Sequence, residues 1–228
     1  MSQPVIPGHE WEPDWTPEGV PVSRRYADPF FSLQDGLSES RHVFIAGSDF
    51  PARFRPGLSV AELGFGTGLN LLALWEAWDR SGTPGHLHFT SFEIALLDPA
   101  HVCRALDAFP ALADRRAALV AALEAGSLRF RLGPVDVELI PGDARETLPR
   151  WAGKADAWFL DGFAPARNPE LWEPGLMSAV AGRSNAGATV ATYSAAGHIR
   201  RGLAAAGFNV SRTGGFAGKR HMTRGRLS

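Results

Sequence analysis

The sequence has a single cysteine, Cys103, so it can form no internal disulfide and offers no thiolate framework for a metal. Its seven histidines show no metal-ligand spacing, and no metal site is predicted. No apolar run approaches the ~18 residues that span a bilayer, and the polar, proline-rich beginning lacks the basic-then-apolar order of a secretory signal. These absences predict a cytoplasmic protein that does not enter a membrane.

Lysine is also scarce, with 2 residues against 21 arginines, and no acid follows Glu173. The region after Glu173 carries eight basic residues, a charge of +8, whereas the first 173 residues hold 24 acidic and 15 basic groups, a charge of −9. This division suggests that one end of the protein faces a polyanion such as nucleic acid. Solvated arginines that bind nothing would give the same composition, so charge alone leaves the question open.

The chain has 228 residues, of which 45% are hydrophobic and 21% charged, as expected for one large globular domain rather than a disordered protein. Five prolines among the first 22 residues oppose helix formation, so we expect an extended N-terminal arm that is pinned by Trp11 and Trp15. Residues 1–57 are predicted to form this arm and a turn-rich cap segment. Residues 58–228 are predicted to form the main domain of the same globular unit.

From residue 58 onward, buried strands alternate with helical patterns. Strands are predicted at 58–63, 87–93, 155–160 and 189–193, and helices at 69–79, 98–108, 111–125, 144–151, 171–183 and 197–206. Alternating runs on either side of Gly133-Pro134 indicate an inserted β-hairpin, and the last strands are predicted at 208–212 and 220–226. The alternation predicts an α/β fold with a doubly wound, mostly parallel sheet.

A glycine-rich motif joins the first of these strands to the following helix. Its G-x-G-x-G spacing is typical of enzymes that bind S-adenosylmethionine, where the loop wraps the amino-acid part of the cofactor. A dinucleotide-binding loop would need its third glycine at position 69, where this sequence has leucine, which disfavours a nicotinamide oxidoreductase. The residues predicted here to bind the cofactor are Glu62, Gly64, Phe65, Gly66, Thr67, Gly68 and Asn70.

Two further acids are expected to complete the cofactor site. Glu93 ends the second strand 25 residues after Gly68, where a carboxylate can accept hydrogen bonds from both ribose hydroxyls. Asp143 and Ala144 follow the hairpin and are expected beside the adenine. Asp143 would serve equally well as the N-cap of the next helix, and the two roles are compatible.

The string Asp161-Gly-Phe163-Ala-Pro165 closes the fourth buried strand. Ligands of open parallel sheets bind outside the carboxyl ends of the strands, so Asp161 is expected near the cofactor, with Phe163 and Pro165 as an apolar wall. The string is similar to the Asp/Asn-Pro-Pro-aromatic loop that amino-methylating enzymes have at this place, and this likeness implies an amine substrate. An amine becomes cationic as it is methylated, and Asp161 is predicted to orient the amine and stabilise that charge. Because a carboxylate raises the pKa of a nearby ammonium, loss of the proton to water before attack is the more economical hypothesis.

Several strings together resemble the MnmD family, the methyltransferase module of the bifunctional MnmC tRNA-modifying enzymes. They lie between Tyr26 and Met222 and comprise residues 28–32, 35–44, 62–70, 91–93, 156–169 and 214–222. The resemblance implies a Rossmann-like class I methyltransferase fold and methyl transfer from S-adenosylmethionine to the amine of 5-aminomethyl-(2-thio)uridine at the tRNA wobble position. The product would be 5-methylaminomethyl-(2-thio)uridine.

The expected partner is the anticodon stem-loop of tRNA. The residues predicted to face the substrate RNA are Tyr26, Phe163, Pro165, Arg200, Arg201, Lys219 and Arg220. Many family members continue into an FAD-dependent oxidoreductase, and because this sequence ends at Ser228, a separate oxidoreductase or other enzyme is expected to supply the amine. Two alternatives remain: N-methylation of another amine, or a tRNA-binding module without catalysis, although intact Asp161 and Glu93 argue against the second.

Overall fold

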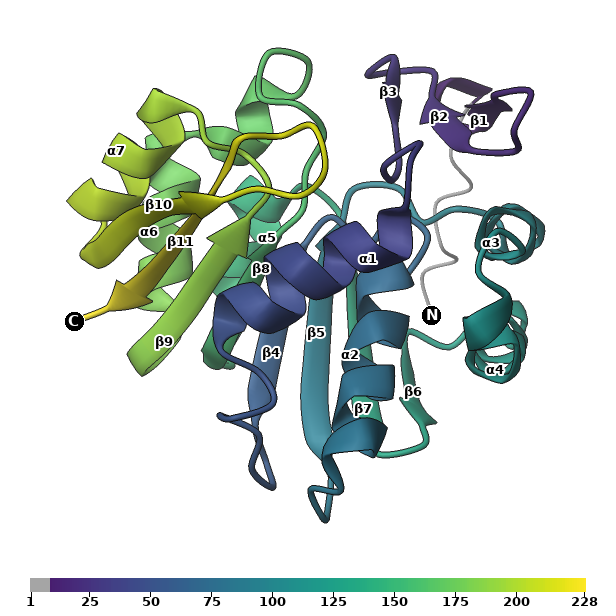
Figure 1. Cartoon of the computed structure of the whole chain (residues 1–228), viewed down its shortest axis with the longest axis horizontal. Coiled ribbons are helices and arrows are strands. Elements are labelled where there is room, and N and C mark those ends of the chain that lie inside the picture. The colour runs from purple at the N-terminus through teal and green to yellow at the C-terminus, as the bar shows by residue number, and fades with distance from the viewer. Residues whose placement is uncertain (1–8) are drawn as a thin grey trace.

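The computed structural model describes residues 9–228, and its centre is an eight-stranded sheet with helices on both faces (Figure 1). The strand order is β10-β11-β9-β8-β4-β5-β7-β6. These strands are β4 (Ser59–Leu63), β5 (Leu87–Glu93), β6 (Arg129–Leu132), β7 (Val135–Pro141), β8 (Ala155–Leu160), β9 (Ser184–Thr192), β10 (Phe208–Gly214) and β11 (His221–Leu227). The five central strands run parallel, while β6, β10 and β11 pair antiparallel at the two edges. The predicted α/β fold with a mostly parallel sheet is confirmed.

The predicted hairpin is integrated into this sheet. Its second strand, β7, pairs in parallel with β5, and only β6 lies at the edge. At the other side of the sheet, β9 begins at Ser184 rather than at the predicted residue 189. The polar, glycine-containing residues 184–187 lack the apolar character by which a strand is recognised in sequence, so the prediction began too late.

Helices divide the core into two clusters, one on each face of the sheet. The first cluster includes residues of α1 (Gly36–Ser40), α2 (Leu69–Ser81), α3 (Pro99–Leu106) and α4 (Ala113–Glu124). The second includes residues of α5 (Ala144–Arg150), α6 (Pro174–Gly182) and α7 (Gly197–Ala205). Neighbouring residues of a strand point to opposite faces, so Phe159 packs in the first cluster and Trp158 in the second, both fully buried. β8 is therefore covered on both sides.

The proline-rich N-terminal segment forms a separate three-stranded antiparallel sheet of β1 (Pro13–Trp15), β2 (Pro21–Ser23) and β3 (Asp28–Pro29). The guanidinium of Arg104, on α3, lies 3.9 Å from the ring centroid of Trp15. The ring of Trp11 packs edge-on against Tyr26 at 6.3 Å between centroids. Trp15 thus holds the segment against the main domain as predicted, whereas Trp11 packs within the segment itself. Residues 1–8 of the predicted arm lie outside the described residues.

A helical segment that the sequence did not reveal runs diagonally in front of the strands, over one face of the sheet, in Figure 1. α1 continues into a π-helical turn, Arg41–Ile45, and a 3-10 turn, Ala46–Ser48. Val43, Phe44 and Ile45 are buried in the same core cluster as the residues of α2. The segment was predicted as a turn-rich cap because the mixed helical turns are short and contain glycine, so no 3.6-residue periodicity is visible.

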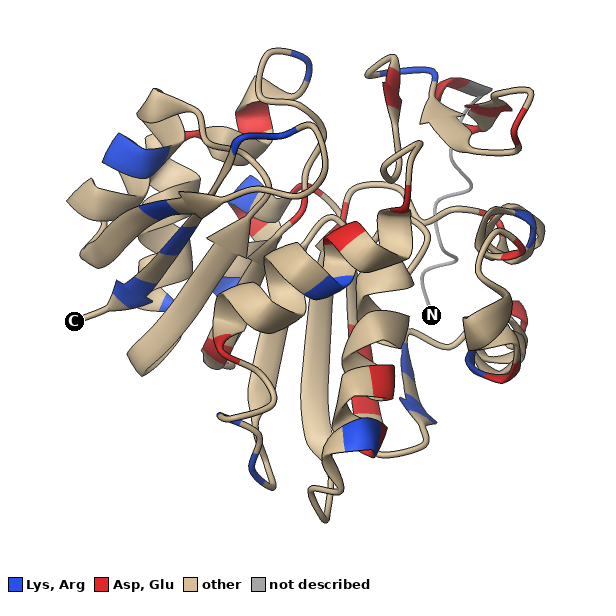
Figure 2. Ribbon diagram, in the orientation of Figure 1, with Lys and Arg blue, Asp and Glu red and all other residues tan. Residues whose placement is uncertain are grey.

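Seven of the eight basic residues after Glu173 lie on α7, on β10 and β11 and in the loop between these two strands, and the eighth, Arg183, follows α6 (Figure 2). Part of their charge is neutralised by acids from the beginning of the chain. Asp49 accepts hydrogen bonds from Arg224 and Arg226 at 2.6 and 2.9 Å, and Glu39 accepts one from Lys219 at 2.7 Å. The folded protein therefore separates positive from negative charge less than the sequence does, because acids from the beginning of the chain lie beside basic residues from its end.

Within residues 9–228, no helix is long and apolar enough to cross a membrane. Among the same residues, no group of three or more histidine, cysteine, aspartate or glutamate side chains is arranged to hold a metal ion.

Candidate active site

A cavity of about 560 Å³ opens at the carboxyl ends of β4, β5 and β8. The sheet register brings these ends together, because Leu63 at the end of β4 pairs with Phe92 of β5 on one side and with Leu160 of β8 on the other. The residues that follow each strand therefore meet at one edge of the sheet. The glycine loop, Glu93 and Asp161 all line the cavity, as the sequence predicted.

A network of buried polar side chains holds Asp161. The amide nitrogen of Asn70 donates to Asp161 Oδ2 at 2.6 Å and to Glu62 Oε1 at 2.9 Å. The amide oxygen of Asn70 accepts from the Ser40 hydroxyl, and Ser91 Oγ donates to Glu62 Oε2 at 2.7 Å. Glu62 is fully buried and does not line the cavity, so its place in the site is to fix Asn70.

Burial raises the pKa values of both acids in this network, Asp161 and Glu62. Desolvation raises the pKa of Asp161 to about 7, against the opposing hydrogen bond from Asn70. Desolvation also raises the pKa of Glu62 well above its usual range, although Ser91 and Asn70 both favour its charged form. Near neutral pH, Asp161 is therefore poised between its two protonation states, which is the range in which a carboxyl group can exchange a proton with an amine.

Two glycines of the loop are required by the fold itself, because a side chain at either position would meet other atoms of the protein. Gly64 has a φ of +89°, and a Cβ atom there would lie 2.2 Å from the carbonyl oxygen of Asp161. At Gly66, with a φ of +52°, a Cβ atom would lie 3.2 Å from the ring of Phe30. Phe65 and Thr67 line the cavity beside them, whereas Gly68 lies behind the loop against Leu119 and outside the cavity lining.

Glu93 is positioned to receive hydroxyl groups. Its two carboxylate oxygens accept from the backbone N–H groups of Gly66 and Ala95, each at 3.0 Å. Burial raises the pKa of Glu93, and these backbone hydrogen bonds oppose the rise. A carboxylate offers about four lone-pair positions, so the hydrogen bonds from Gly66 and Ala95 do not use its whole capacity as an acceptor.

Asp143 accepts from the N–H of Arg145 at 2.8 Å and so caps α5, and its carboxylate also pairs with the Arg145 guanidinium at 2.6 Å. Asp143 and Ala144 both line the cavity. The two roles that the sequence left open for Asp143, helix cap and cavity residue, are compatible in the structure.

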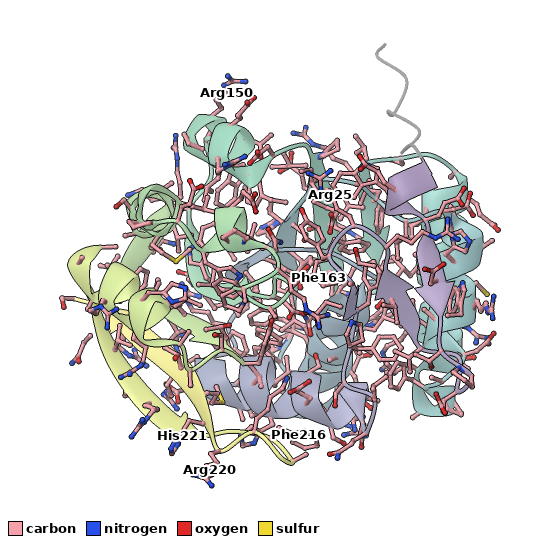
Figure 3. The ribbon with its side chains drawn as sticks, turned by 90° about the horizontal axis from the view of Figure 1, so that it is seen from above. Arg25, Arg150, Phe163, Phe216, Arg220 and His221 are labelled. Carbon is pink, nitrogen blue, oxygen red and sulfur yellow. The ribbon has the colours of Figure 1, made fainter. Side chains whose placement is uncertain are left out.

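An aromatic wall of Tyr26, Phe30 and Phe163 lines the cavity next to the glycine loop, where the Phe30 ring lies close to Gly66. The ring of Phe163 lies 4.9 Å from that of Tyr26 and 5.1 Å from that of Phe30. Asp28 accepts from the N–H of Ala164 at 2.8 Å, which ties the small N-terminal sheet to the loop after β8. In Figure 3, Phe163 lies near the centre of the molecule when it is seen from above. Pro165 follows in the same loop but does not line the cavity.

Only one of the four basic residues predicted to face RNA lines the cavity. Lys219 lies in the loop between β10 and β11, and its ammonium is paired with Glu39. Arg220 is exposed beside it and lies at the edge of the molecule in Figure 3. On α7, Arg201 is exposed and Arg200 is half-buried, as expected for neighbours on a helix, and both lie away from the cavity lining.

Four residues that the sequence did not single out belong to the cavity: Phe30, Glu39, Ser40 and Tyr193. The first three lie in the strings that carried the family resemblance, and this was the available signal. Tyr193 follows β9 directly and reaches the cavity because β9 pairs in parallel with β8. Strand order is a tertiary property, so nothing local to the residue marks it.

Residues 112–228 match a family described as S-adenosyl-L-methionine-dependent methyltransferase. The chain belongs to this methyltransferase family. The S-adenosylmethionine cofactor predicted from the glycine loop is thereby confirmed, and so, with the observed sheet, is the Rossmann-like methyltransferase fold that the family resemblance implied.

The similar proteins extend the match to nearly the whole chain. The chain is 44% identical over 227 residues to the "tRNA 5-methylaminomethyl-2-thiouridine biosynthesis bifunctional protein MnmC" of Stutzerimonas stutzeri, covering 95% of this chain and 34% of that protein. The protein of the same name from Caulobacter is 43% identical over 219 residues, which cover 90% of this chain and 36% of that protein. The crystal structure of MNMC2 from Aquifex aeolicus superposes with a TM-score of 0.76 at 27% identity, covering 95% of this chain and 70% of the other. The chain thus spans about a third of the length of these two bifunctional relatives.

Proposed function

We propose that this methyltransferase transfers a methyl group from S-adenosylmethionine to the primary amine of 5-aminomethyl-(2-thio)uridine at the wobble position of tRNA. The product is 5-methylaminomethyl-(2-thio)uridine. The observation that carries the proposal is a cavity in which Asp161 lies between a glycine loop and an aromatic wall, in a chain 44% identical to an MnmC protein over 227 residues.

The residues of the cavity fit S-adenosylmethionine. The backbone of Gly64, Phe65 and Gly66 lines one side, and Glu93 has acceptor positions left for ribose hydroxyls. Asp143 and Ala144 lie where the adenine is expected. Glu93 and Asp161 also make the lining acidic, which favours a cationic sulfonium ligand.

The protein's task is to position the amine and manage its charge. Bound S-adenosylmethionine supplies an electrophilic methyl group that a neutral amine attacks in line. Asp161 accepts a hydrogen bond from the amine and stabilises the positive charge that develops on nitrogen. Asn70 fixes the carboxylate for this contact through its 2.6 Å hydrogen bond. With its pKa near 7, Asp161 can also take up the proton that the amine loses, so proton loss to water is not the sole route.

The partners follow from this chemistry. The anticodon stem-loop of tRNA would approach over Tyr26 and Phe163, with Arg220, Arg200 and Arg201 available to phosphates at greater distance. An FAD-dependent oxidoreductase activity, or another enzyme, would supply the aminomethyl group. These steps belong to the cytoplasm, where tRNA is modified.

The test is a methyl-transfer assay on two anticodon stem-loops that differ only in the wobble base, 5-aminomethyluridine or uridine. Labelled S-adenosylmethionine and nucleoside mass analysis should show one methyl group on the first RNA and none on the second. Methylation of both RNAs, or of a small amine in preference to RNA, would point to another amine substrate. Binding of RNA without any transfer would point to an inactive binding module.

A further inference from the structure

The ammonium of Lys219 lies in a small site of its own at the cavity. Its Nζ donates to Glu39 Oε1 at 2.7 Å and lies 4.3 Å from the ring centroid of Tyr193. Only 13% of the Glu39 side chain is exposed, so this carboxylate is largely withdrawn from water. A buried carboxylate together with an aromatic face is the usual protein environment for an alkylammonium ion.

We propose that Glu39 and the ring of Tyr193 form the subsite that binds the protonated aminomethyl group of the substrate, and that Lys219 occupies this subsite as a stand-in until substrate arrives. The identity of the amine rests on the proposed function. The existence of an alkylammonium subsite does not, because it follows from the contacts of Lys219.

The presence of lysine rather than arginine at position 219 supports its role as a stand-in for the substrate amine. The chain has 2 lysines among its 23 basic residues, and one of them occupies this position. A lysine side chain ends in a primary ammonium on a methylene group, and so does a protonated aminomethyl group. The planar guanidinium of arginine has a different shape and would not mark a site for a compact ammonium.

The subsite is connected to Asp161 from two sides. The hydroxyl of Tyr193 donates to the carbonyl oxygen of Gly162, the residue after Asp161, at 2.8 Å. Ser40, next to Glu39, donates to Asn70, which in turn donates to Asp161. An amine that leaves Glu39 would therefore next contact Asp161, whose carboxylate is linked to the subsite by these hydrogen bonds.

Lys219 can leave the subsite at low cost. Its side chain is 46% exposed, and ion pairs with so accessible a partner contribute little to stability. It lies in a loop with Gly215 and Gly218, and Gly218 and its neighbours are exposed. Once displaced, the Lys219 ammonium would extend into solvent, whereas Glu39 would stay in place on α1. The exchange would make capture of the ammonium the step that distinguishes an aminomethyluridine from uridine.

The two-lysine composition makes a direct experiment possible. Reductive methylation with ¹³C-formaldehyde labels Lys154, Lys219 and the N-terminal amine, and the two lysine signals are assigned with Lys154→Arg and Lys219→Arg. Lys154 is exposed and away from the cavity lining, so it is the internal control. Titration with methylammonium should shift the Lys219 signal and leave that of Lys154 unchanged, and Glu39→Gln should abolish the shift. Equal shifts of both signals, or none at Lys219, would overturn the subsite.

The same labelled protein distinguishes the subsite from the RNA function. The stem-loop with 5-aminomethyluridine should shift the Lys219 signal, whereas the uridine stem-loop should bind without this shift. If both RNAs shift Lys219 equally, the lysine contacts the RNA backbone and the stand-in role is wrong. If methylammonium shifts Lys219 but neither RNA binds, the subsite stands and the proposed function fails.

Kinetics provide an independent check on Glu39. Glu39→Gln should raise the KM for the aminomethyl stem-loop about tenfold, the loss expected for one charge-assisted hydrogen bond, while affinity for the uridine stem-loop stays the same. Glu124→Gln removes the same charge from the exposed end of α4 and should change neither value. Lys219→Ala should lower the KM, because the competing ammonium is gone. A higher KM in Lys219→Ala would show that the lysine assists binding and would contradict the proposal.

Discussion

The two walls of the cavity are built in different ways. One, the sheet wall, consists of the glycine-loop residues 64–67 together with Glu93 and Asp161, which lie at the carboxyl ends of β4, β5 and β8. The other, the outer wall, consists of Tyr26, Phe30, Glu39 and Lys219, which come from the N-terminal sheet, α1 and the β10–β11 loop. The sheet wall is held by backbone pairing and buried hydrogen bonds, whereas the outer wall is held by ring contacts and an ion pair with an exposed lysine.

This difference separates two tasks. A sheet edge provides backbone N–H groups and fixed carboxylates, which are the groups proposed above to bind S-adenosylmethionine. Segments outside the sheet can take on a shape and charge that suit one substrate. Changes in the sheet wall should therefore affect the cofactor or the chemical step, and changes in the outer wall should affect the RNA substrate alone.

The largest effect is expected from Asp161→Asn in the sheet wall. Methyl transfer should slow by roughly 10²-fold or more, because the amide accepts a hydrogen bond but cannot offset the cationic nitrogen. Affinities for cofactor and RNA should stay within a few-fold. Single-turnover transfer of a labelled methyl group measures the rate, and a rate near wild type would remove the role of Asp161.

The next effect concerns cofactor affinity. Glu93→Ala should weaken S-adenosylmethionine binding by ~1–3 kcal/mol, because the ribose hydroxyls and the N–H of Gly66 lose their acceptor. Calorimetry measures this loss, with Glu146→Ala, an exposed acid on α5, as the matched control. Unchanged affinity in Glu93→Ala would mean that the cofactor does not occupy this side of the cavity.

The outer wall should show the opposite pattern. Tyr26→Leu removes the ring packed at 4.9 Å on Phe163 and should raise the KM for the aminomethyl stem-loop about fivefold, with cofactor affinity unchanged. Tyr26→Phe keeps the ring and should restore most of the loss. A fall in cofactor affinity in Tyr26→Leu would break the division between the two walls.

Ionisation of Asp161 should also lower the stability of the folded protein as the pH rises. Its native pKa of about 7 lies above the unfolded value, so the folded state binds more protons between about pH 4 and pH 7 and loses stability as the pH rises through that range. Asp161→Asn removes this loss, so its free energy of unfolding should exceed that of the wild type by about 1 kcal/mol at about pH 8 and equal it at about pH 4. The figure is smaller than the full pKa shift would give, because the open cavity admits water that screens the carboxylate. Urea unfolding at both pH values measures the difference, and a gain at low pH alone would contradict the raised pKa.

The smallest effect concerns the exposed arginines. Arg220→Ala should weaken RNA binding a few-fold and make the log–log salt slope shallower by ~0.7 to 0.9, the value for one lost phosphate contact. Arg150→Ala, at the opposite edge of the molecule in Figure 3, is the control and should leave the slope unchanged. Equal slopes in both variants would show that the charge asymmetry of the sequence does not mark the RNA surface.

The sheet wall could be predicted from sequence because each of its parts is a local pattern at a strand end. An apolar run followed by glycines or by a single acid identifies Gly64, Glu93 and Asp161 without knowledge of neighbouring strands. The outer wall could not be predicted in this way. The helical turns at 36–48 show no periodicity, and Tyr193 and Lys219 meet Glu39 only after the strands have taken their order.

The sequence alone determined the class of fold, the cofactor loop and the acid at the end of β8, because these depend on residues adjacent along the chain. Tertiary structure decided which charges meet. Asp49 neutralises Arg224 and Arg226, Glu39 pairs with Lys219, and Asn70 links Glu62 to Asp161. Coulombic and hydrogen-bond energies depend on separation in space and on burial, and neither quantity is contained in the spacing of residues along a chain.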